Sequence, residues 1–183
     1  MRLAGQHLDN SGTTSLARDI PGPYDPDEMR LFLDTFHYGE EAFLIDEITE
    51  LDVRKRQARA RMDTNRFLPF AQYQRVRPGH PGHVSGSEII MATANLGCLH
   101  AWFFHGCRWS EGWVAFGTRI QKAEFKNLAL VGPPLELRSR EVRSRVGPNR
   151  TTIRFEFEFS QKGNPVYLGD QTATLLKQPS HLG

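Results

Sequence analysis

A single segment of the chain limits the folds that are open to it. Residues 85–88, Ser-Gly-Ser-Glu, have the S-x-x-E pattern of a helix capping box, and a strongly apolar run follows directly. Apolar residues recur in that run at helical spacing on two adjoining faces: Ile89, Ala92, Leu96, Leu99 and Phe103, then Ile90, Ala94, Gly97 and Ala101. A helix that is apolar on most sides has to be buried. The rest of the chain must therefore wrap around this helix.

The segments on either side of the helix alternate between apolar and polar residues in the manner of β-strands. A short helix with an acidic, proline-containing first turn is expected from Asp25 onwards. Six strands are expected, one starting at Phe43 and the others at 56–63, 113–125, 135–145, 151–159 and 167–176. An antiparallel sheet of about six strands around one long buried helix, an α+β fold, buries these surfaces most economically.

Composition restricts the domain count and the partners. A chain of 183 residues with 39% hydrophobic and 24% charged residues is expected to form one domain. Residues 1–24 are rich in Gly, Ser, Thr and Pro, so we expect a flexible N-terminal arm followed by a single domain over 25–178. The formal net charge of +2 argues against nucleic-acid binding. The N-terminal residues lack a signal-peptide core and the apolar run is short for a membrane span, which predicts a cytoplasmic protein without a membrane partner.

Four residues near the end of the expected helix have the chemistry of metal ligands. On a helix, Cys98 and His105 share a face while His100 points elsewhere, so these three and Cys107 cannot close one tetrahedron. We therefore expect no metal and no cofactor. His100 and His105 are expected to pack in the core or to lie at the helix C-terminus.

The order of two strands, a loop, a buried helix and a long antiparallel run resembles the hotdog fold. Residues 43–48 resemble the PFLLVDRI-type opening of FabZ-type 3-hydroxyacyl-ACP dehydratases, and residues 125–126 with 131–137 resemble their FKRPVVPGDQL-type segment. Residues 79–90 are similar both to the dehydratase GHFPG…MPGVLIIEAMAQ motif and to the GHFNAVELI segment of FcoT-like hotdog proteins, described as acyl-thioesterases. The resemblance covers roughly residues 40–177.

This resemblance implies an enzyme that acts on acyl-CoA or acyl carrier protein thioesters and assembles as a homodimer or higher homo-oligomer. Hydrolysis is the preferred reaction, because His83 and Glu88 keep the FcoT-like spacing. A dehydratase-like lyase is the second, and it is disfavoured because Met91 stands where the dehydratases have their acid. A non-catalytic acyl-binding module and the addition of a nucleophile to an enoyl thioester stay open.

The site implied by the resemblance lies around the N-terminus of the long helix, where free N–H groups can polarise a thioester carbonyl. The expected catalytic residues are His83, favoured over His80 as proton carrier, together with Glu88 and Asn95. Glu88 is either a general base or the capping-box partner of Ser85. Asn95 either holds substrate or water, or pairs across a symmetric interface. The expected substrate-binding residues are Gly86, Ser87, Met91 and Tyr73, of which Tyr73 is alternatively a surface aromatic.

Overall fold

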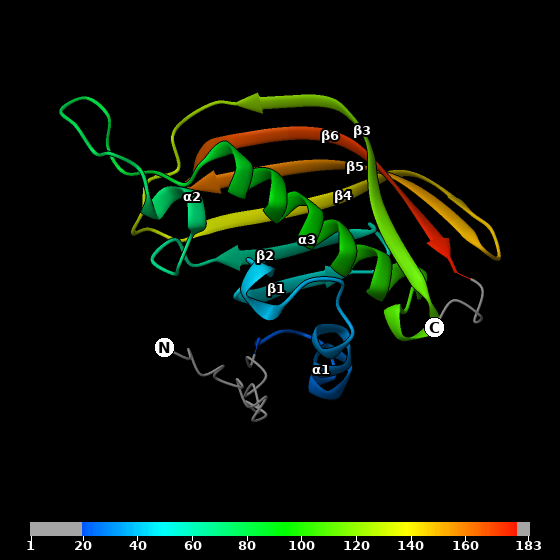
Figure 1. The fold of residues 1–183 in the computed structure, drawn as a ribbon. Helices are drawn as coiled ribbons and strands as arrows, with labels where there is room; N and C mark the ends of the chain where they lie inside the picture. Colours follow the sequence, from blue (N-terminus) through cyan, green and yellow to red (C-terminus); the bar gives the residue numbers. More distant parts are fainter. Residues whose placement is uncertain (1–19, 179–183) are drawn as a thin grey trace, which may run out of the picture.

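The computed structural model describes residues 20–178 (Figure 1). Its elements in chain order are α1 (Pro26–Asp34), a 3-10 turn η1 (Glu40–Ala42), β1 (Glu47–Asp52), β2 (Gln57–Met62), α2 (Pro69–Gln72), α3 (Gly86–His105), a second 3-10 turn η2 (Trp109–Glu111), β3 (Trp113–Phe125), β4 (Leu135–Val146), β5 (Arg150–Gln161) and β6 (Asn164–Lys177). Within this part of the chain, no helix is both long enough and apolar enough to cross a membrane.

The six strands form one sheet in the order β1-β2-β4-β5-β6-β3, and every neighbouring pair is antiparallel. Helix α3 lies across one face of this curved sheet (Figure 1). The chain passes from β2 through α3 to β3, which lies at the opposite edge of the sheet from β1. The expected sheet of six antiparallel strands around one buried helix is confirmed.

The core lies between α3 and the concave face of the sheet. In β5, Ile153, Phe155, Phe157 and Phe159 are buried, and Arg154 and Glu158 between them are exposed, as the alternation predicts. Full burial of each such side chain contributes about 1.5–3 kcal/mol of transfer free energy. Helix α3 ends at His105 and is capped by Gly106, whose φ of 63° is the left-handed conformation that favours glycine at a C-cap.

Two boundaries differ from the sequence expectations. The first strand begins at Glu47 and not at Phe43, because residues 43–45 pack into the core as an irregular segment, with the Phe43 ring 5.4 Å from Phe32. Residues 20–24, expected in a flexible arm, are packed on the domain: Ile20 is buried, and the Pro21 carbonyl accepts the Ile48 N–H at 2.9 Å. Residues 1–19 of that arm lie outside the described residues.

Candidate functional site

The N-terminus of α3 is fixed by a capping box. Ser85 is the N-cap; its Oγ accepts the N–H of Glu88 at 3.3 Å, and the Glu88 Oε2 accepts the N–H of Ser85 at 2.8 Å. Within residues 20–178, the N–H groups of Gly86 and Ser87 have no hydrogen-bond acceptor. The first turn of α3 therefore presents two free donors at the positive end of the helix dipole.

This helix terminus borders an open cleft of about 380 Å³, which we call the entrance cleft. Its lining includes His83, Gly86 and Ile89 from the loop and helix, and Phe125, Lys126 and Leu128 from the end of β3 and the loop after it. A β-carbon on Gly86 would lie 3.3 Å from the Phe125 ring, so the glycine allows this ring to approach the helix backbone closely.

Hydrogen bonds to Gln74 and Pro81 hold the backbone and the ring of His83 in place at the entrance cleft. The Gln74 side chain accepts the His83 N–H at 3.1 Å and donates to the His83 carbonyl at 2.8 Å. The His83 Nδ1 lies 2.9 Å from the Pro81 carbonyl oxygen. Because a carbonyl only accepts, Nδ1 carries the proton of a neutral ring, and Nε2 is then the nitrogen that can take up a proton.

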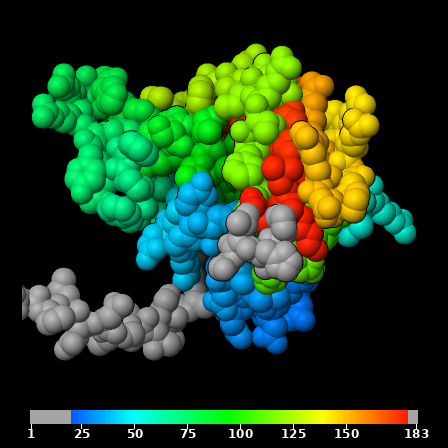
Figure 2. All heavy atoms as spheres, turned by 45° about the vertical axis from the view of Figure 1, so that its right-hand side comes forward, coloured from blue at the N-terminus to red at the C-terminus, as the bar shows by residue number. Residues whose placement is uncertain are grey.

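The side chains of three predicted site residues are not part of the entrance-cleft lining. His80 is exposed, with its ring 5.2 Å from that of His83, and its backbone pairs with Arg77. Tyr73 is 78% exposed, which agrees with its alternative interpretation as a surface aromatic. The segment between β2 and α3, coloured teal to green, projects from the molecule (Figure 2). Ser87 is exposed and does not line the cleft.

The structure uses Glu88 as a capping residue. Besides the Ser85 N–H, its carboxylate accepts the N–H groups of Phe70 at 2.9 Å and Ala71 at 3.1 Å, both in the first turn of α2. The side chain is buried and both oxygens are engaged by backbone donors. Glu88 thus joins α2 and the loop to α3, and its carboxylate is occupied by backbone donors and does not line the entrance cleft.

Replacing Glu88 with alanine is expected to destabilise the protein, because three backbone N–H groups lose their acceptor together. Stranded buried donors cost about 1–3 kcal/mol each and are not fully additive, so we expect a loss of about 3 kcal/mol. For a chain of this size that is a fall in Tm of roughly 6–12 °C, measured by calorimetry. The matched control is Ser87→Ala on the same turn, which should change stability by less than about 0.5 kcal/mol. A loss below about 1 kcal/mol for Glu88→Ala would contradict the capping role.

A second cavity lies further along α3, between the helix, the strands β3, β5 and β6, and the segment after α1. This inner cavity has a volume of about 150 Å³ and is lined mainly by apolar groups, including Met91, Gly97, Phe155 and Phe157. Cys98 also lines it, and burial raises the pKa of this thiol to about 12, so it stays protonated at neutral pH.

Asn95 reaches the inner cavity from the middle of α3. Its side chain is 1% exposed, and its Oδ1 accepts the N–H of Leu44 at 2.8 Å. This bond satisfies the buried amide oxygen within the chain and ties the irregular segment before β1 to the helix. Asn95 is thus itself part of the cavity wall, and its hydrogen bond is made to a segment that does not line the cavity.

Three polar side chains at the inner cavity were not expected from the sequence. The Thr93 Oγ1 donates to the Gln171 Oε1 at 3.2 Å, and the Gln171 Nε2 donates to the Tyr167 hydroxyl at 2.9 Å. His37 lies on the cavity wall, and burial lowers the pKa of this imidazole. Only the packing of α3 against β6 brings Thr93 and Gln171 together, so spacing along the chain carries no signal for them.

Gly97→Ala is expected to stabilise the protein and to narrow the inner cavity. The added β-carbon would lie 3.7 Å from the Phe155 ring and 3.9 Å from the Phe157 ring, which is ordinary contact. Alanine in a helix interior gains about 0.5–1 kcal/mol over glycine. Chemical denaturation should show this gain as a higher unfolding free energy. A fall in the unfolding free energy would show that the cavity wall has no room for a methyl group.

The sequence matches no protein-family model and no curated protein. Solved structures do match it. A mutant of the thioesterase PA1618 from Pseudomonas aeruginosa has a TM-score of 0.56 at 14% identity, over 85% of this chain and 97% of that one. The dehydratase heterocomplex ApeI:P from Xenorhabdus doucetiae gives 0.56 at 12% identity, over 78% and 88%. A hypothetical thioesterase with coenzyme A from Streptococcus pneumoniae gives 0.50 at 11% identity, over 73% and 88%.

These similarities show that the chain has the hotdog fold, as the sequence resemblance predicts. Its structural neighbours include both thioesterases and a dehydratase.

Proposed function

We propose that this protein is a hotdog enzyme that hydrolyses acyl thioesters. The observation that carries the proposal is the pair of free N–H groups at Gly86 and Ser87, at the start of a buried helix and beside the entrance cleft that also holds His83. Donors fixed in this way stabilise the negative charge that develops on a carbonyl oxygen during acyl transfer. The same positive helix end favours that charge further.

In the proposed reaction, the thioester carbonyl oxygen accepts hydrogen bonds from the two N–H groups. The His83 Nε2 removes a proton from a water molecule as the water oxygen forms a bond to the carbonyl carbon. The tetrahedral intermediate then collapses, its C–S bond breaks, and His83 returns the proton to the departing sulfur. The products are a carboxylic acid and a thiol, and no other reactant is needed.

The size and polarity of the proposed acyl group are inferred from the inner cavity. A cavity of about 150 Å³ with apolar walls is large enough for benzene in another protein. We therefore propose short acyl or aryl-acyl groups of about six carbons, carried as thioesters of CoA or of an acyl carrier protein. The mainly apolar lining favours an uncharged chain.

Hydrolysis is preferred over dehydration because of what lines the two cavities. Within residues 20–178, no carboxylate lines the entrance cleft or the inner cavity. Met91, which by the resemblance stands where the dehydratases have their acid, lies on the wall of the inner cavity. Dehydration of a 3-hydroxyacyl thioester needs a group that protonates the leaving hydroxyl.

A mixed panel of saturated, 3-hydroxyacyl and enoyl thioesters, each offered on CoA and on carrier protein, tests the proposal. Mass spectrometry of the products distinguishes the reactions, and thiol release gives the rate. Release of free acid from short saturated thioesters is the expected result. An enoyl product would establish the dehydratase alternative, and acyl binding without turnover would establish the binding module.

We further propose a homodimer that pairs along β3. This strand is 13 residues long, lies at the edge of the sheet, and exposes about half of Phe116, Ile120 and Phe125. A long edge strand presents a row of unpaired N–H and C=O groups, which is a template for pairing with another strand. Light scattering on the purified protein should give twice the mass of 20.9 kDa.

The proposed compartment is the cytoplasm, because both cysteines are free thiols.

A further inference from the structure

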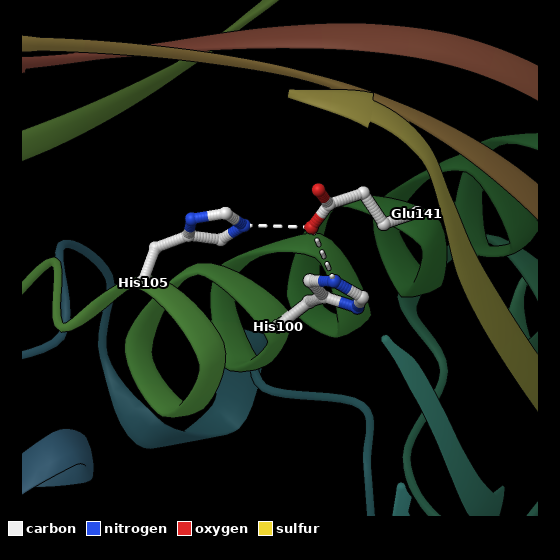
Figure 3. Close-up of side chains that lie close together, drawn as sticks. All are labelled: His100, His105 and Glu141. Carbon is white, nitrogen blue, oxygen red and sulfur yellow. Dashed lines mark hydrogen bonds and ion pairs between the residues drawn. The ribbon is translucent and has the colours of Figure 1, made fainter. Parts of the chain in front are cut away.

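Two histidines at the C-terminal end of α3 meet one carboxylate from β4 (Figure 3). The Nε2 atoms of His100 and His105 lie 3.3 Å and 2.7 Å from the same oxygen, Oε2 of Glu141. The exposed fractions of the three side chains are 0%, 4% and 10%. The two Nε2 atoms therefore approach one carboxylate oxygen, and all three side chains are almost fully buried.

The packing around this cluster fixes the His100 ring. The ring makes edge contacts with Phe104 at 4.4 Å and with Phe155 at 5.1 Å. Its other nitrogen, Nδ1, lies 3.4 Å from the Ser139 Oγ. A histidine that binds a metal through one ring nitrogen usually donates its other N–H to an oxygen, which also fixes the tautomer. Ser139 is placed to receive that N–H.

We propose that His100, His105 and Glu141 form a binding site for a divalent transition-metal ion of the zinc class. Two imidazole nitrogens and a carboxylate oxygen are a ligand set that such ions prefer, and water would complete a four-coordinate shell. The three ligand atoms lie within 4.8 Å of one another. Two ligand atoms of a tetrahedral ion, each about 2.0–2.2 Å from it, are about 3.3–3.6 Å apart. The His100–Glu141 pair at 3.3 Å already has this spacing, and the His105–Glu141 pair at 2.7 Å would have to open slightly to admit the ion.

Other polar groups near the cluster are Ser144, which hydrogen-bonds to the Glu141 carboxylate, and Arg56, whose guanidinium donates to the Phe104 carbonyl. Arg56 adds a positive charge near His100, so it lowers the affinity for a cation below that of an isolated ligand set. The competing arrangement is a metal-free network in which both histidines donate to Glu141.

The proposed metal site is independent of the proposed hydrolysis. His105 follows Glu88 by 17 residues in the same helix, a separation of about 25 Å. A metal there would join the last turn of α3 to β4 and would not touch the entrance cleft. Its presence is therefore expected to change stability and to leave the chemistry at the N-terminus of α3 unaltered.

The test is a Co²⁺ titration of the full-length protein after dialysis against a chelator. We expect one Co²⁺ per chain, visible absorption bands of a four-coordinate ion, and displacement of those bands by Zn²⁺. Saturating Zn²⁺ should raise Tm by about 5 °C or more. An absorption spectrum like that of aqueous Co²⁺, together with an unchanged Tm in Zn²⁺, overturns the proposal in favour of the metal-free network.

Variants then assign the ligands. Glu141→Gln and His105→Gln should each weaken Co²⁺ binding at least about tenfold. The matched control is Glu136→Gln, which removes the same charge from the same strand at a carboxylate that pairs with Arg61 on the outer surface. Equal binding by Glu141→Gln and Glu136→Gln would overturn the assignment. Circular dichroism confirms that each variant is folded, and the titration of the unaltered protein decides the matter if one is not.

Discussion

Replacing Gly86 with proline is expected to lower kcat for thioester hydrolysis about 10²–10³-fold and to leave the fold intact. Proline removes the N–H that, in the proposed mechanism, donates to the carbonyl oxygen in the transition state. Loss of one such donor has this effect in enzymes that stabilise an oxyanion. Steady-state kinetics with a short acyl-CoA measures it, and KM should change much less than kcat.

The structure explains why proline should fit at this position. Gly86 is the first residue of α3, where proline is common because the helix requires no N–H bond there. Ser85 before it has φ −71° and ψ 158°, the extended conformation that a residue preceding proline adopts. The substitution therefore removes a donor without removing a hydrogen bond of the fold.

Gly86→Ala is the matched control. Its β-carbon would also approach Phe125, at 3.3–3.4 Å, but the N–H group stays. We expect its kcat to remain within a few-fold of the parent enzyme. If both variants lost activity equally, crowding of the entrance cleft and not the missing donor would be responsible. If neither lost activity, the N-terminus of α3 would not be the oxyanion site.

His83→Gln is expected to lower kcat by about 10²–10⁴-fold, the usual contribution of a general base. Glutamine keeps a polar side chain of similar size but cannot take up a proton near neutral pH. The loss should appear in kcat, measured by thiol release.

His80→Gln distinguishes the two histidines of the loop. His80 is exposed and does not line the entrance cleft, so its substitution should change kcat by less than about threefold. Equal losses in both variants would assign the proton transfer to the pair. A large loss for His80→Gln alone would contradict the assignment to His83.

The parts of the fold that the sequence predicts are those with a local cause. The capping box at Ser85 and Glu88 sets where α3 begins, and its apolar faces set its burial. The alternation in β5 sets which residues face the helix. The sequence predicts that the first strand begins at Phe43 because residues 43–45 have the composition of a strand. In the structure the strand begins at Glu47, and the Leu44 N–H donates to the Asn95 side chain and not to a neighbouring strand.

In the candidate site too, residues that are close in sequence could be predicted to lie together, and pairs distant in sequence could not. His83 and Gly86 are close to the helix N-terminus in sequence and lie together in the entrance cleft. The contacts of Glu88 with α2 join residues 17 and 18 positions apart, and Glu141 meets the two histidines across 36 and 41 positions. Such pairs depend on how a helix packs on a sheet, and periodicity within one segment cannot predict that.

Strand β3 is both the proposed subunit contact and part of the wall of the inner cavity. Ala115, Phe116 and Gly117 of this edge strand are part of the wall of the inner cavity, and the strand has β6 as its one partner in the sheet. In the proposed homodimer, a second subunit along the open side of β3 would contact the strand that forms this part of the cavity wall, where the proposed acyl group lies. Substitutions at the subunit contact would then change the preferred acyl chain length, although none of the substituted residues would touch the substrate.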